Sequence, residues 1–234
     1  MILAIDTSTR YAGIAFVDEQ GLLTQLMHWR SIRNHTVELM PTIDKILERA
    51  EARLKDVACI AIARGPGNFS ALRAGLSVAK GLAWTLGLPI VAPTTLATEA
   101  YTHHAYNNPI CSILDVGRNQ LAWAVFEGTS GILRQVTDET ISDPVEFMAS
   151  IPPKALICGE GLEKFGDVLR MSSQNQANLA FPYLPSQRVA SLASLAWQRF
   201  HTGDVESANT LRPLYLRRPT ITPPKRAIAK QLNP

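Results

Sequence analysis

The sequence predicts an α/β fold made of two similar lobes. An apolar run at 58–63 is followed by a glycine-proline turn and a long helical pattern at 72–86, an order typical of a sheet buried on both faces. The pattern that opens the chain returns about halfway along it. Of the 234 residues, 46% are hydrophobic and 18% are charged, so the chain can bury a large core.

The first hundred residues read as three strands, then helix, strand, helix and strand. We expect the strands at 2–5, 11–17, 22–29, 58–63 and 89–93, and the helices at 38–54 and 72–86. Residues 18–21 form the turn between the second and third strands. In the first helix, Pro41 either marks the first turn or kinks the helix.

The second helix has more apolar surface than one sheet can cover. Its main apolar face carries Leu72, Leu76 and Leu86 at helical spacing. A second face is small and apolar, and it consists of Ala71, Ala74, Gly75, Val78 and Gly81. Either a neighbouring helix of the same lobe or another subunit covers this second face, and the pattern leaves both open.

The turn before this helix is rich in residues that favour tight turns. It consists of Gly65, Pro66 and Gly67, and we expect it to be structural. Asn68 or Ser70 can then cap the helix.

The second half of the chain repeats the first at a shift of 109 residues. Residues 2–6 align with 111–115, and 14–18 align with 123–127, without a gap. Both halves therefore begin with a strand, an aspartate, a polar turn and a second strand. Further on, we expect helices at 144–150 and 189–200 and a strand at 155–158.

The sequence lacks the patterns that are typical of membrane-spanning, secreted, disulfide-bonded and zinc-binding proteins. No apolar run approaches the roughly 20 residues of a membrane span, and no signal-peptide pattern is present, so we expect a cytoplasmic protein. Cys59, Cys111 and Cys158 lie in apolar segments far apart in the sequence. We interpret them as small buried residues rather than as disulfides or zinc ligands.

The glycine-punctuated helix carries a specific family resemblance. The run 65–83, GPGNFSALRAGLSVAKGLA, together with the segment 5–9, closely resembles the bacterial TsaB (YeaZ-type) proteins of tRNA threonylcarbamoyladenosine biosynthesis. The long motif is specific to TsaB and to its catalytic relative TsaD. Individually weaker matches extend the resemblance over most of the chain, at His35, 39–41, 114–119, 157–161 and 211–217.

The resemblance implies the actin-like and Hsp70-like ATPase (ASKHA) fold. In that fold, two ribonuclease-H-like lobes with mixed sheets of the five-stranded type face a cleft, and the second lobe looks abbreviated here. We expect an N-terminal lobe at 1–104, a C-terminal lobe at 105–218 and a basic, proline-rich tail at 219–234. The last helix, at about 189–200, can pack back on the N-terminal lobe.

The resemblance also points to a vestigial nucleotide site. In the superfamily, the loop after the first strand holds phosphates through backbone N–H groups. The matching residues here are Asp6, Thr7, Ser8, Thr9, Asp115, Gly159 and Gly161. The first loop lacks glycine, however, and its aspartate and hydroxyls can equally well form a turn by bonding the local backbone.

A metal site is not expected. TsaD-like relatives carry a His-x-x-x-His pair after the strand that follows the glycine-rich helix, and the matching positions here hold Thr95 and Glu99. His103 and His104 are adjacent, so they point in different directions. We therefore expect no metal, no metallopeptidase activity and no cofactor, with nucleotide only as a vestigial or complex-dependent ligand.

The sequence and the resemblance together favour a protein that works by binding. The resemblance implies a noncatalytic subunit that pairs with TsaD, which transfers a threonylcarbamoyl group to the anticodon-adjacent adenosine of tRNAs reading codons that begin with A. It also implies a TsaE-type ATPase as a second partner and tRNA bound through the complex. The expected partner-binding residues are Leu39, Ile43, Ala71, Ala74, Gly75, Val78 and Gly81.

Two alternatives accompany this interpretation. A stand-alone ASKHA-fold ATPase or small-molecule kinase would need tight nucleotide binding in the cleft. In the absence of its partner, the small apolar face of the helix at 72–86 would allow two copies of the chain to form a homodimer.

The C-terminal end has a charge pattern of its own. Residues 217–234 contain Arg217, Arg218, Lys225, Arg226 and Lys230 and no acid, whereas the whole chain has a net charge of only +3. The basicity is therefore local. It fits either a solvated tail or a segment that contacts tRNA phosphates.

Overall fold

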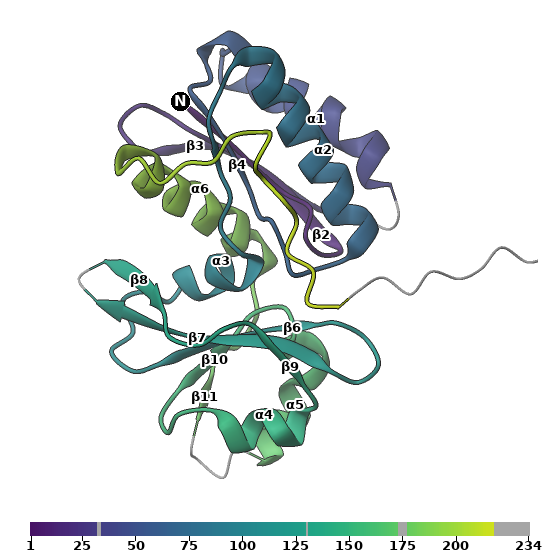
Figure 1. Cartoon of the computed structure of the whole chain (residues 1–234), viewed down its shortest axis with the longest axis vertical. Coiled ribbons are helices and arrows are strands. Elements are labelled where there is room, and N and C mark those ends of the chain that lie inside the picture. The colour runs from purple at the N-terminus through teal and green to yellow at the C-terminus, as the bar shows by residue number, and fades with distance from the viewer. Residues whose placement is uncertain (32–33, 130, 173–176, 218–234) are drawn as a thin grey trace, which may run out of the picture.

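Two mixed β-sheets, one above the other in Figure 1, form the framework of the chain. The structure is a computed structural model, and it describes residues 1–31, 34–129, 131–172 and 177–217. The predicted basic tail at 219–234 lies outside the described residues.

The first sheet has the strand order β3-β2-β1-β4-β5. Its members are β1 (Ile2–Asp6), β2 (Tyr11–Val17), β3 (Leu23–Arg30), β4 (Cys59–Ile62) and β5 (Ile90–Val91). The central strand β1 is antiparallel to β2 and parallel to β4, so that Ile5 lies opposite both Ile14 and Ile62. Both β1 and β4 are fully buried, as their unbroken apolar runs predict.

The second sheet repeats this arrangement. Its order is β11-β10-β6-β7-β8, with β9 pairing on β7. Its members are β6 (Ile110–Asp115), β7 (Leu121–Thr129), β8 (Ile132–Gln135), β9 (Thr140–Ser142), β10 (Leu156–Cys158) and β11 (Asn178–Leu179). Like β1, β6 is antiparallel to the next strand in sequence and parallel to β10. This equivalence confirms the repeat that the sequence predicts.

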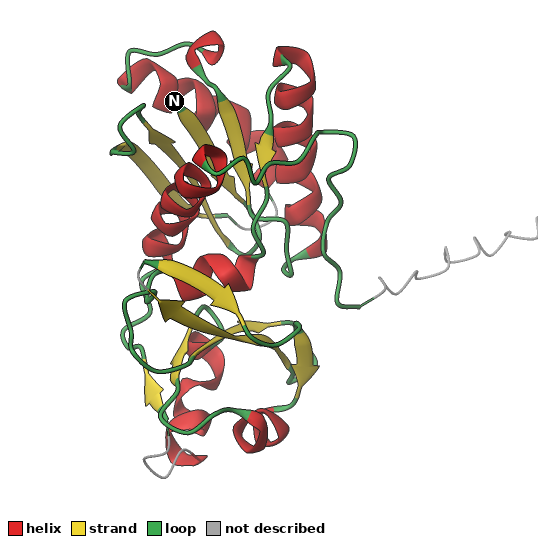
Figure 2. Ribbon diagram, turned by 60° about the vertical axis from the view of Figure 1, so that its left-hand side comes forward, coloured by secondary structure: helices red, strands yellow, loops and turns green. Residues whose placement is uncertain are grey.

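Three helices cover the two faces of the first sheet (Figures 1 and 2). Helices α1 (His35–Arg49) and α2 (Phe69–Leu86) pack side by side on one face. Helix α6 (Pro185–His201), which comes from the end of the chain, packs on the other face. Its apolar residues are Val189, Leu192, Ala193 and Ala196.

The second sheet is also covered on both faces. Helices α4 (Pro144–Ser150) and α5 (Leu162–Ser172) bury Phe147 and Phe165 on one face. Helix α3 (Thr95–Tyr101) buries Leu96 on the other face. Consequently α3 and α6 meet between the two sheets.

Some predicted boundaries and elements are wrong. Helix α1 begins at His35 rather than at residue 38, because the Asn34 carbonyl already accepts from the N–H of Val37. It ends at Arg49, and a separate 3₁₀ turn, η1 (Leu54–Asp56), follows it. Helices α3 and α5 were not predicted from the sequence. None of the described helices combines the length and the apolar character that crossing a bilayer requires.

Helix α2 begins and ends at the expected kinds of residue. The Asn68 side chain accepts from the N–H of Ala71, and Gly87 ends the helix in the left-handed region, at φ 67°. Gly65, Pro66 and Gly67 join β4 to this helix. A Cβ atom on Gly67 would lie 2.1 Å from the Ser8 carbonyl oxygen, so this turn packs directly on the loop between β1 and β2.

The small face of α2 is divided between the core and the surface. Ala71 and Gly75 are buried, and a Cβ atom on Gly75 would lie 2.2 Å from Thr7 Oγ1. Gly81, by contrast, is exposed, and a Cβ atom on it would have no neighbouring atom within 4 Å. The chain itself therefore covers the beginning of this face and leaves its end open.

This contrast gives a matched pair of substitutions on one helix. Gly75→Ala is expected to destabilise the chain by about 1–3 kcal/mol, because the added methyl group displaces Thr7 from its place against the helix. Gly81→Ala should instead stabilise it by about 0.5–1 kcal/mol, since alanine favours an exposed helix more than glycine does. Urea denaturation of both variants measures the difference, and a loss of stability in both would contradict this packing.

Candidate functional site

A cleft of about 520 Å³ lies between the two lobes. Its walls come from several separate parts of the chain, which the topology brings together. Among them are residues 8–10 after β1, residues 66–69 at the start of α2, residues 114–117 at the end of β6, Glu160, and residues 214–217, and Ile141 of β9 adds one more side chain. Of the residues predicted for a vestigial nucleotide site, Ser8, Thr9 and Asp115 line this cleft, whereas Asp6, Thr7, Gly159 and Gly161 do not.

The first loop uses most of its polar groups within the protein. Asp6 Oδ1 accepts from the backbone N–H of Ser8 at 2.9 Å and from its hydroxyl at 2.6 Å. Thr7 Oγ1 donates to the Ala71 carbonyl oxygen at 2.8 Å. Neither Asp6 nor Thr7 lines the cleft. These contacts are the ones that the turn interpretation requires.

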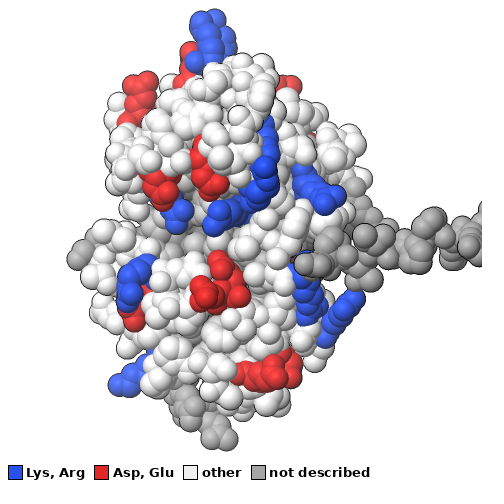
Figure 3. Space-filling view, in the orientation of Figure 1, with Lys and Arg blue, Asp and Glu red and all other residues white. Residues whose placement is uncertain are grey.

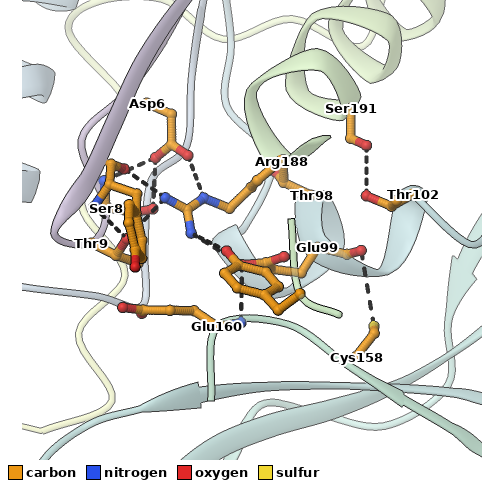
Figure 4. A network of polar contacts seen from close by, with 12 residues as sticks. Asp6, Ser8, Thr9, Thr98, Glu99, Thr102, Cys158, Glu160, Arg188 and Ser191 are labelled. Atoms are coloured by element: carbon orange, nitrogen blue, oxygen red, sulfur yellow. Dashed lines mark hydrogen bonds and ion pairs between the residues drawn. The ribbon is translucent and has the colours of Figure 1, made fainter. Parts of the chain in front are cut away.

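A buried arginine, Arg188 of α6, stands at the centre of a polar network next to the cleft (Figure 4). Its side chain is 1% exposed, and all five of its N–H groups are used. Nε donates to Asp6 Oδ2 and Nη1 donates to Glu99 Oε1 at 3.1 Å. The remaining three acceptors are Tyr183 Oη at 3.0 Å, Thr9 Oγ1 at 2.9 Å and the Tyr11 carbonyl oxygen at 2.7 Å.

Two carboxylates compensate this buried charge. Burial lowers the pKa of Arg188, but the charges of Asp6 and Glu99, the neighbouring Tyr183 and the hydrogen bond to Asp6 together outweigh burial and hold that pKa well above its ordinary value. Burial raises the pKa of Glu99, while the charge of Arg188 and a hydrogen bond from Tyr183 oppose the rise. The guanidinium is thus ionised in the interior, where only paired charges are tolerated.

Glu160 lies beside this network, at the wall of the cleft. It is 8% exposed, and burial raises its pKa to about 7, although the charges of Arg188 and Arg10 act in the opposite direction. Arg10 Nε lies 3.2 Å from Glu160 Oε1, and Arg10 also pairs with Glu163. Tyr11 Oη donates to Glu163 Oε1 at 2.7 Å. These contacts join the first loop to the start of α5.

The second half contributes a less buried turn. Asp115 Oδ1 accepts from the N–H of Gly117 and pairs with Lys164 Nζ, each at 2.9 Å. A Cβ atom on Gly159 would lie 2.5 Å from the Ile113 carbonyl oxygen, and one on Gly161 would lie 2.9 Å from the Ile113 side chain. Both glycines are therefore required by close packing on β6.

These residues do not fit a magnesium nucleotide as they stand. The Asp6 carboxylate, which would handle the metal, is bonded to Arg188 and Ser8 and lies outside the cleft lining. Within the described ranges, no group of three or more His, Cys, Asp and Glu side chains could hold a metal ion. Thr95 and Glu99 are both buried on α3, and Glu99 faces Arg188.

The three cysteines are free and buried. Burial raises the pKa of both Cys59 and Cys111 to about 12 and raises that of Cys158 as well. Such thiols remain protonated near neutral pH and are poor nucleophiles.

Sequence reasoning missed Arg188, Tyr183 and Glu160. One signal for Arg188 was available, because it precedes Leu192 by four residues and Leu195 by seven and so shares their side of the helix. A charged residue in line with an apolar face indicates a buried ion pair. The sequence could not identify its partners, which lie 182 and 89 positions away in Asp6 and Glu99.

The predicted partner-binding face needs correction. Leu39 and Ile43 are 0% exposed and belong to the core beneath α1, so their assignment to a partner contact is wrong. Ala71 and Gly75 are buried as well, and Ala74 is 9% exposed. Val78 is half-buried, and only Gly81 of the predicted set is open.

The exposed sides of α1 and α2 carry a different set of apolar groups. Val37 is 74% exposed and Met40 is 38% exposed on α1, and Trp84 is 68% exposed on α2. Pro41 and Ser77 are also exposed on these helices.

Comparison with known families gives a match over most of the chain. The family model described as "TsaD: tRNA N6-adenosine threonylcarbamoyltransferase" matches residues 30–218. The TsaB protein of Bacillus subtilis is 33% identical over 138 residues, which cover 59% of this chain and 60% of that protein. The TsaB protein of Escherichia coli is 26% identical over 225 residues, which cover 92% and 94%.

Solved structures resemble the chain over a similar span. YeaZ from Pseudomonas aeruginosa has a TM-score of 0.77 and is 28% identical, covering 92% of this chain and 99% of that one. A kinase-like protein from Listeria monocytogenes, Lmo2764, has a TM-score of 0.52 at 10% identity, covering 86% and 99%, and so shares the fold alone. Together with the two mixed sheets, these similarities confirm the ASKHA fold and the resemblance to TsaB and YeaZ.

The raised pKa of Glu160 predicts a specific dependence of stability on pH. Between pH 4.5 and 7, the folded chain keeps this carboxyl group protonated, whereas the unfolded chain releases the proton. Below pH 4.5 this group therefore does not reduce the free energy of unfolding. As the pH rises from 4.5 toward 7, the free energy of unfolding falls by at most about 1.4 kcal/mol per pH unit. Glu160→Gln should flatten this part of the profile.

Urea denaturation at several pH values measures this effect. Glu48→Gln, at an exposed position on α1, is the control and should keep the wild-type profile. Equal slopes in Glu160→Gln and the wild-type chain would contradict the assignment.

Proposed function

We propose that this chain, which belongs to the TsaD family of tRNA N6-adenosine threonylcarbamoyltransferases, is a noncatalytic subunit in tRNA threonylcarbamoyladenosine biosynthesis. The relatives named TsaB support the pathway, since one of them is matched over nearly the whole of both chains. The noncatalytic role rests on the contents of the site.

The observation that carries the noncatalytic role is the Arg188 ion pair with Glu99. Glu99 stands where the resemblance places the second histidine of the catalytic relatives, and Thr95 stands where it places the first. Glu99 is 3% exposed and bonds Arg188, Tyr183 and the N–H of Glu160. All three contacts are to Oε1, so this carboxylate is held in a buried ion pair, and it stands where the catalytic relatives have a neutral histidine ligand.

The partner we propose is a TsaD-type catalytic subunit that docks on the exposed sides of α1 and α2. These helices lie side by side on the outer face of the first lobe (Figure 1). Val37, Met40 and Trp84 are large apolar side chains left uncovered there, and Gly81 leaves room for a second helix to approach closely. A TsaE-type ATPase would join this pair, and a second copy of the chain would take the same surface when the partner is absent.

The basic end of the chain would serve the same complex by contacting tRNA. The described chain ends at residue 217, which lines the cleft, and Figure 3 shows Lys and Arg side chains on both lobes of the face drawn there. Arg73, which donates to Tyr215 Oη near this end of the described chain, is exposed. Phosphate contacts of this kind would weaken with salt.

Calorimetric titration separates the subunit from the stand-alone ATPase or kinase. Titration with the cognate TsaD-type protein should give binding, and titration with magnesium-ATP should give none. Tight nucleotide binding without partner binding would overturn the proposal and favour a phosphoryl-transfer enzyme of the same fold.

Substitution of the open glycine tests the docking surface. Gly81→Arg should weaken binding of the TsaD-type partner by roughly 100-fold or more, because a long charged side chain fills the space that close packing requires. The chain should still fold, since the position is open in the isolated protein. Val145→Arg, at a 76% exposed position on α4, is the matched control and should bind normally. Full binding by Gly81→Arg would place the interface elsewhere.

A further inference from the structure

The two lobes have separate hydrophobic cores. The apolar residues of α6 belong to a buried cluster with the first sheet, and those of α3 belong to a cluster with the second sheet. No buried apolar cluster in the described part of the chain joins the two sheets. Because apolar packing does not set the angle between the lobes, other contacts must set it.

The contact between α3 and α6 is polar. Glu99 of α3 pairs with Arg188 of α6, and the Thr102 and Ser191 hydroxyls lie 2.8 Å apart one turn further along (Figure 4). Unlike apolar packing, hydrogen bonds of this kind require particular distances and directions. This contact therefore specifies one arrangement of the two helices.

Most of the hydrogen bonds of Arg188 are to the first lobe, and they fix the direction in which its remaining N–H groups point. Asp6, Thr9 and the Tyr11 carbonyl oxygen hold Nε and Nη2, and all three belong to β1, β2 or the loop between them. Nη1 is then directed at Glu99, on the helix that covers the second sheet. The planar guanidinium cannot turn toward a displaced Glu99 without losing its bonds to the first lobe.

We propose that Arg188 is an interlobe clasp, a single buried guanidinium that holds the two lobes at one angle without a bound ligand. Further polar ties between the lobes lie at the cleft wall, where Arg10 pairs with Glu160 and Glu163 and Tyr11 donates to Glu163. The Arg10 side chain is 44% exposed, and ion pairs exposed to solvent contribute little. The buried tie is therefore the one that fixes the width of the cleft.

The distance between the lobes tests the clasp. Spin labels on Glu48→Cys of α1 and Ala149→Cys of α4 report on the first and second lobes, because both positions are exposed, whereas the three native cysteines are buried. The doubly labelled chain with no further substitution should give one narrow distance distribution in pulsed electron paramagnetic resonance. Arg188→Met should broaden or shift that distribution, since it removes the tie and leaves two carboxylates unpaired.

A second variant keeps the test decisive if Arg188→Met does not fold. Glu99→Met removes the acceptor on the second lobe but leaves Arg188 paired with Asp6, so the buried charge stays compensated. It should also broaden the distribution, whereas Glu163→Gln, which weakens only the exposed tie, should leave it narrow. A folded Glu99→Met protein with the unaltered distance distribution would overturn the clasp.

The clasp and the docking surface can fail independently. Helices α1 and α2 cover one face of the first sheet, whereas α6 covers the other. Glu99→Met should therefore bind the TsaD-type partner normally while its lobe distance changes. Loss of partner binding in Gly81→Arg carries no information on the clasp.

Discussion

A buried positive charge imposes the strictest requirement in this structure. A guanidinium in the interior needs a compensating carboxylate and an acceptor for each of its five N–H groups. Arg188 finds these acceptors in the loop between β1 and β2, on α3 and at Tyr183, and so in parts of the chain that lie far apart in sequence. The positions of all these segments must therefore agree with one another.

The first loop shows how this requirement propagates. Asp6 bonds Arg188 through Oδ2 while Ser8 holds Oδ1, and Thr7 anchors the same loop to α2 through the Ala71 carbonyl oxygen. The loop can approach α2 because Gly75 presents no side chain to Thr7. The glycine-rich motif that identifies the family thus also supports the polar network, through close packing on its buried side.

The sequence predicted the elements whose physical cause is local. Unbroken apolar runs located β1 and β4, and the polar turn at residues 18–21 located the hairpin between β2 and β3. Helix α3 escaped because all seven of its residues are buried, which removes the contrast between an apolar and a polar side. The ion pairs of the site were beyond reach, since nothing local to Arg188 indicates that Asp6 and Glu99 will lie beside it.

The misassignment of Leu39 and Ile43 has a general cause. Apolar periodicity identifies the side of a helix that will be buried, but it does not say which body buries it. Here the protein's own first sheet takes the regular apolar stripe of α1, which is the strongest pattern in that helix. In the proposed complex, a docking partner is left with the side that periodicity marks as polar, and there the informative residues are exceptions to the pattern. The exposed Val37 of α1 and the exposed Trp84 and open Gly81 of α2 are such exceptions, and the proposed complex would cover all three.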